Sequence, residues 1–78
     1  MRKKEWKLII TFSTTESAMA MEEVCQNRQV EGRLIPTPQM ISAGCGLAWC
    51  ASPRSRKILT DLMEQAGIRA ESVVECLF

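Results

Sequence analysis

Cys45 is the residue of this sequence whose surroundings best suit covalent chemistry. It stands between Gly44 and Gly46, after the proline-containing stretch "PTPQMISA". Glycines on both sides let the backbone turn tightly and keep side-chain bulk away from the sulfur. Their amide groups can also point at an anion. A small buried residue in a hairpin turn is the alternative, since free cysteines are often buried, but filling a core requires no flanking glycines.

A second polar stretch, "FSTTES" at residues 12–17, predicts the start of a helix. Ser13 fits an N-cap, and Glu16 completes a capping box three residues later. A helix N-terminus carries about half a positive charge and favours an adjacent anion, so a cysteine beside it ionises more readily. The residues predicted to surround the sulfur are hydroxyl carriers and glycines: Ser13, Thr14, Thr15, Ser42, Gly44 and Gly46.

The other three cysteines have ordinary structural explanations. Cys25 falls on the apolar face of a predicted helix, and Cys50 and Cys76 lie inside predicted strands. The chain has no histidine and no C-x-x-C motif, so we expect neither a metal site nor a cofactor. Three disulfide pairings would be open in an exported protein, whereas all four residues are thiols in a reducing compartment.

Hydrophobic periodicity and turn residues predict the elements that position Cys45. Strands are expected at 5–12, 33–36, 46–51 and 69–78. Helices are expected at about 14–28 and from Ser52-Pro53 to a C-cap at Gly67. The order βαββαβ predicts one α+β domain spanning 1–78, of the ferredoxin-like kind. Short, right-handed connections then give an antiparallel sheet in the order 4-1-3-2 with both helices on one face.

This topology places two distant segments together. The first strand ends, and the third strand begins, at the same edge of the sheet. We therefore expect 12–17 and the turn around Cys45 to meet there, some thirty residues apart in sequence.

Composition and charge exclude several classes of protein. The 78 residues carry ten basic and nine acidic side chains, a net charge of +1, which gives no support for nucleic-acid binding. The apolar run Leu8–Phe12 is too short for a signal peptide, and no stretch approaches the length of a membrane span. We expect a cytoplasmic protein.

Two surface features suggest contacts with other proteins. Arg54, Arg56 and Lys57 open the second predicted helix, where the helix dipole disfavours cations, and they form a candidate docking patch far from Cys45. Trp6 and Trp49 are expected on the sheet. On the face without helices they would leave an exposed apolar patch that suits a homodimer.

The segments "TFSTTESAMAMEE" and "RLIPTPQMISAGCGLAW" resemble the small bacterial selenium/sulfur carrier-like domains, and the likeness covers nearly the whole chain. The matching positions are Phe12, Ser13, Ala18, Pro36, Pro38, Ile41, Ser42, Cys45 and Gly46. Gln39 stands where an arginine often follows the second proline in those proteins. The resemblance implies that Cys45 carries sulfur or selenium as a persulfide-like adduct, received from a donor protein and passed to an acceptor.

Two hypotheses of different classes follow. In the first, the protein is a cysteine-based carrier rather than a stand-alone enzyme. In the second, it is a small regulatory or interaction module that binds a ligand or protein without covalent chemistry, because fold alone does not determine function. A metallochaperone is a weaker third hypothesis, since paired cysteines are missing.

Overall fold

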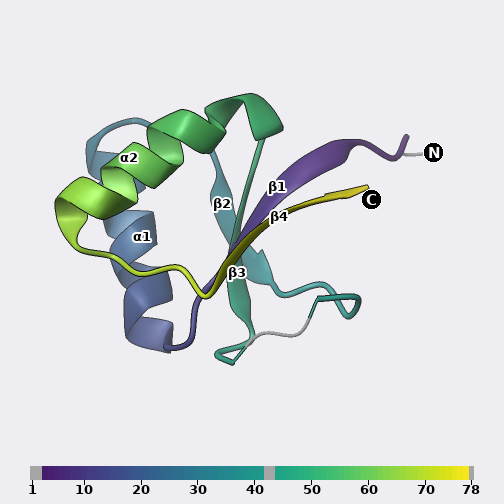
Figure 1. The fold of residues 1–78 in the computed structure, drawn as a ribbon, viewed down its shortest axis with the longest axis horizontal. Coiled ribbons are helices and arrows are strands. Elements are labelled where there is room, and N and C mark those ends of the chain that lie inside the picture. The colour runs from purple at the N-terminus through teal and green to yellow at the C-terminus, as the bar shows by residue number, and fades with distance from the viewer. Residues whose placement is uncertain (1–2, 42–43, 78) are drawn as a thin grey trace.

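The structure, a computed structural model, describes residues 3–41 and 44–77. Four strands and two α-helices follow one another in the predicted order (Figure 1), with a short 3-10 helix before the second α-helix. The elements are β1 (Trp6–Thr11), α1 (Thr15–Asn27), β2 (Arg33–Pro36), β3 (Leu47–Ala51), η1 (Pro53–Ser55), α2 (Arg56–Ala66) and β4 (Ser72–Leu77).

The four strands form one antiparallel sheet in the order β2-β3-β1-β4, which confirms the predicted order. In the register, Thr11 at the end of β1 pairs with Ala48 of β3 and with Ser72 of β4. The end of β1 therefore lies beside the beginnings of both neighbouring strands. The segment that precedes β3 and the segment that precedes β4 meet at that edge.

Both helices pack on the same face of the sheet (Figure 1). Alternate residues of β1 point to that face, because successive side chains of a strand point to opposite sides. Leu8, Ile10 and Phe12 are fully buried there. They form one core with residues of β3, α1 and α2, namely Trp49, Ala51, Ala18, Met21, Cys25, Leu59, Leu62 and Met63.

The condition for an apolar patch of both tryptophans on the open face is not met, because Trp49 lies on the other face. Trp49 is 2% exposed and belongs to the core under the helices. Gly32 makes room for it: a Cβ at position 32 would overlap the indole Nε1. Trp6 is 60% exposed but lies, by strand alternation, on the same side as Leu8. The predicted homodimer therefore loses the support of an apolar patch on the open face, and it stays a prediction.

The caps of the helices differ in part from the prediction. Thr14, not Ser13, is the N-cap of α1, and its hydroxyl accepts a hydrogen bond of 3.1 Å from the amide of Ser17. Ser52 is the N-cap of η1 but makes no side-chain cap, and the Glu31 carboxylate accepts a hydrogen bond of 3.2 Å from its amide. Gly67 ends α2 in the left-handed conformation, as predicted.

The basic cluster at the start of α2 is largely neutralised by carboxylates of the same chain. The Arg56 Nη1 atom lies 3.4 Å from Oε2 of Glu75, and the Lys57 Nζ atom lies 3.4 Å from Oδ2 of Asp61. Arg54 is exposed. An exposed ion pair contributes about 0–1 kcal/mol to stability, so these contacts organise the surface more than they stabilise the fold. The role of this cluster as a docking patch stays a prediction.

Candidate functional site

Cys45 lies on the turn that leads into β3, at the edge of the sheet where α1 begins. Its amide donates a hydrogen bond of 3.3 Å to the carbonyl of Phe12. A Cβ on the neighbouring Gly44 would lie 3.3 Å from the Ser13 carbonyl oxygen, so the two segments are in close contact. The structure thus brings together the stretches that the topology predicts to meet.

The Cys45 sulfur is half-buried and has two hydrogen-bond partners, both on the backbone of Leu47. The Leu47 amide donates to Sγ at 3.4 Å, and the thiol donates to the Leu47 carbonyl at 3.3 Å. This geometry depends on Gly46, whose φ of +78° is in the left-handed region that other residues rarely adopt. The turn at Gly46 therefore folds the backbone of Leu47 around the sulfur.

The predicted cradle of glycine amides differs from the observed one. The Gly44 amide donates to the Glu71 carboxylate at 3.1 Å, so a group of the protein itself occupies that donor. Glu71 in turn donates its own amide to the Thr11 carbonyl at 2.7 Å. The amide that does approach the sulfur belongs to Leu47. The role of Gly44 as a ligand for an added anion stays a prediction.

Ser13, Thr14 and Thr15 are exposed at the beginning of α1. The Thr14 hydroxyl is engaged in the helix cap and also donates to the Ser17 hydroxyl at 3.0 Å. Among the described residues, none of these three hydroxyls forms a hydrogen bond with the Cys45 sulfur. Ser42 lies outside the described residues. The binding roles of these hydroxyls stay predictions.

Glu71 and Leu47 are residues of this site that the sequence reasoning missed. A signal for Glu71 was present: it directly precedes β4, and in the predicted strand order β4 begins beside the end of β1. Leu47 offered no signal through its side chain, because it contributes backbone atoms alone.

The other three cysteines lie in regular elements, and all four are free. Cys25 of α1 is fully buried, and burial raises the pKa of its thiol to about 11. Burial also raises the pKa of the Cys50 thiol, an effect that the positive charges of Lys7 and Arg33 partly oppose. Cys76 lies in β4 opposite Lys7. Cys45 is thus distinct in standing on a turn.

In the described ranges 3–41 and 44–77, no group of three or more His, Cys, Asp or Glu side chains could hold a metal ion. Among the helices of the same residues, none has the length and apolarity to cross a membrane.

Fold and site together define a small α+β domain that presents one turn-borne thiol at a sheet edge. The chain belongs to the family described as "Putative Se/S carrier protein-like", whose sequence model matches residues 7–75. The match covers nearly the whole chain, including Cys45 and its hydrogen-bond partners Phe12 and Leu47. No curated protein and no solved structure matches the chain.

Proposed function

We propose that the protein carries sulfur or selenium on Cys45 as a persulfide-like adduct, between a donor protein and an acceptor protein. The observation that carries this proposal is the position of the Leu47 amide, 3.4 Å from the Cys45 sulfur. An amide donor stabilises a sulfur atom that bears negative charge, and thiolate is the reactive form of cysteine. Membership in the carrier family supports the same role.

The transfer step balances without an added oxidant. Cys45 attacks the outer sulfur of a persulfide on the donor, and the donor's S–S bond breaks as a new S–S bond to Cys45 forms. The donor leaves as a thiol, taking up the proton that Cys45 gave up. In the second step, a nucleophile of the acceptor attacks the outer sulfur and Cys45 leaves. The Leu47 amide then stabilises the departing Cys45 sulfur.

We further propose that this chemistry takes place in the bacterial cytoplasm, where thiols remain reduced. The four free cysteines are consistent with such a compartment. The fold contributes the position of the site and not its chemistry. In the ferredoxin-like arrangement, to which we assign this element order, one sheet edge presents a turn beside a helix N-terminus.

Intact-mass spectrometry of protein freshly isolated from its own host, with and without reductant, tests the proposal. We expect an added mass of one sulfur or selenium atom that reductant removes and that maps to Cys45. Cys45→Ser should abolish it, whereas Cys76→Ser, in a half-buried strand position, should retain it. An unmodified wild-type protein, or equal loading of Cys45→Ser, would instead favour the interaction module without covalent chemistry.

A further inference from the structure

All the charged side chains of α1 are acidic. The helix Thr15–Asn27 carries Glu16, Glu22 and Glu23 but no lysine or arginine. Glu16 is in its first turn, next to the edge where Cys45 lies, and Glu71 adds a carboxylate at the Gly44 amide. Negative charge therefore extends from the thiol turn along the helix.

The cations of the described residues gather at the other end of the sheet. Lys7 of β1 and Arg33 of β2 lie at the end of the sheet that is farthest from the Cys45 turn. Lys7 pairs in register with Cys76, and Arg33 with Cys50. The remaining cations of that end precede β1, follow α1, or lie in η1 and the first turn of α2: Lys3, Lys4, Arg28, Arg54, Arg56 and Lys57. Arg69, between α2 and β4, is the exception. The net charge of +1 is therefore unevenly distributed, although Glu75 and Asp61 pair with Arg56 and Lys57 at the basic end.

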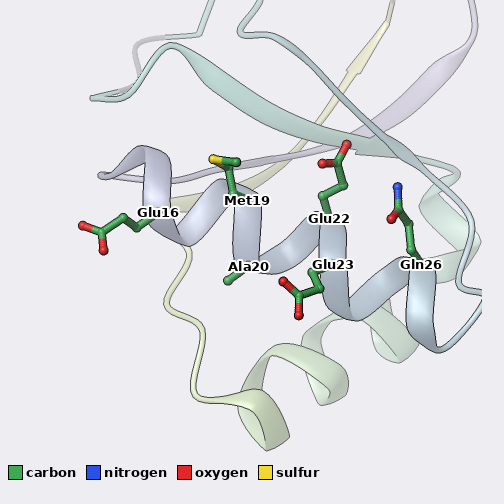
Figure 2. A pocket seen from close by; sticks show the side chains of 6 residues that line it. All are labelled: Glu16, Met19, Ala20, Glu22, Glu23 and Gln26. Carbon is green, nitrogen blue, oxygen red and sulfur yellow. The ribbon is translucent and has the colours of Figure 1, made fainter.

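An exposed methionine lies within the acidic surface. Met19 is 58% exposed, and it lines an open hollow of about 510 Å³ on α1. The lining residues are Glu16, Met19, Ala20, Glu22, Glu23 and Gln26. Figure 2 shows Met19 and Glu22 projecting on the same side of the helix, with Glu16 near its start. Flexible methionine side chains adapt well to binding surfaces.

We infer that this surface, the α1 outer face with Met19 at its centre, docks the donor protein, which presents basic side chains around an apolar pocket. The inference rests on the proposed function. At 1.5 Å per residue, Met19 lies about 6 Å along the helix from Thr15. An interface of about 800 Å² per partner can therefore cover both the hollow and the Cys45 turn.

Charge complementarity favours a separate partner over a second copy. The basic end of another copy is the weaker match for the α1 face, because Arg56 and Lys57 are already paired there with Glu75 and Asp61. A separate protein with a basic surface gains more electrostatic interaction energy on the α1 face. The separation of charge orients this molecule on approach, so that the thiol end arrives first.

The test compares the loaded fraction of Cys45 in protein isolated from the same host. We expect Glu22→Lys with Glu23→Lys to lower it about tenfold, because reversed charge slows encounter. Met19→Ser should lower it several-fold. The matched control, Glu5→Lys with Glu64→Lys, makes the same change of net charge elsewhere and should load like wild type. Alkylation of Cys45 by neutral iodoacetamide should be unchanged in all variants.

Each other outcome overturns the inference. Normal loading of the α1 variant, or equal loss in the control, would show that α1 is not the docking face. Wild-type self-association in sedimentation velocity that the α1 variant abolishes would assign the face to a second copy. A wild-type protein without any load would remove the proposed function itself, which distinguishes that failure from a failure of docking.

Discussion

At the scale of single residues, backbone surroundings separate the cysteines more than their neighbours in sequence do. Cys25 is enclosed by the core, where a thiolate is poorly solvated, and its pKa rises to about 11. Cys45 is half-buried on a turn and has an amide donor at its sulfur. The surroundings of Cys25 therefore disfavour its thiolate, whereas those of Cys45 place a hydrogen-bond donor at its sulfur.

Alkylation kinetics should reveal this difference. In the native protein near pH 8, iodoacetamide should modify Cys45 first and Cys25 only when the protein unfolds. The reason is that Cys25 is fully buried and its thiolate is disfavoured. Peptide mapping by mass spectrometry at timed intervals measures the order. Modification of Cys25 as fast as Cys45 in folded protein would contradict it.

Cys25 should also make stability depend on alkaline pH. Its folded pKa of about 11 lies above the usual 9.0, so the folded state holds this proton more tightly. The contribution is complete below pH 9.0 and is lost as the pH rises through 11. The loss should amount to about 2–3 kcal/mol in the free energy of unfolding.

Urea denaturation from pH 8 to 11 checks this, with Cys25→Ala as the control. The variant lacks the titrating thiol, so its stability should fall less over the same range. Parallel curves for the two proteins would show that other groups cause the decline.

At the scale of elements, local signals in the sequence were sufficient for the order and approximate bounds. Gly67 and Ile68 end α2 as predicted, with the Ile68 amide donating to the Met63 carbonyl. The start of α1 was misplaced by one residue, because Ser13 and Thr14 are both good caps. The cap of η1 was unpredictable locally, since Glu31 reaches it from 21 residues away.

Gly32 should be the least replaceable glycine of the fold. Gly32→Ala should destabilise the protein by about 2–4 kcal/mol, because a Cβ there overlaps Trp49 and the φ of +130° is strained. Gly46→Ala is the matched control: its φ of +78° is also positive, but nothing lies within 4 Å of the added Cβ. It should cost about 1–2 kcal/mol. Urea denaturation with fluorescence of Trp49 measures both, and equal losses would exclude the steric contribution.

At the scale of the whole molecule, the candidate site joins three parts of the chain. The end of β1, the turn before β3 and the residue before β4 are linked by hydrogen bonds of Phe12, Gly44, Glu71 and Thr11. The proximity of the end of β1 to the turn before β3 could be predicted from the topology. The pairing of the Gly44 amide with Glu71 did not, because side-chain partners 27 residues apart leave no local pattern.

Glu71 should hold the thiol turn in place. Glu71→Ala removes the acceptor of the Gly44 amide, so hydrogen exchange of that amide should accelerate about fivefold, for a hydrogen bond of about 1 kcal/mol. Glu71→Gln retains an oxygen acceptor and should exchange more slowly than Glu71→Ala. Glu64→Ala, an exposed glutamate of α2, serves as the control. Nuclear magnetic resonance resolves the individual amide, and unchanged exchange in Glu71→Ala would show that the contact is not retained in solution.

The link between Glu71 and the turn also bears on biosynthesis. A ribosome releases the chain from its N-terminus, and Cys45 emerges 26 residues before Glu71. A nascent polypeptide that has exposed the nucleophile still lacks the final strand and its anchoring carboxylate. On the proposed function, the site that would carry the chalcogen is complete only after translation has passed residue 71.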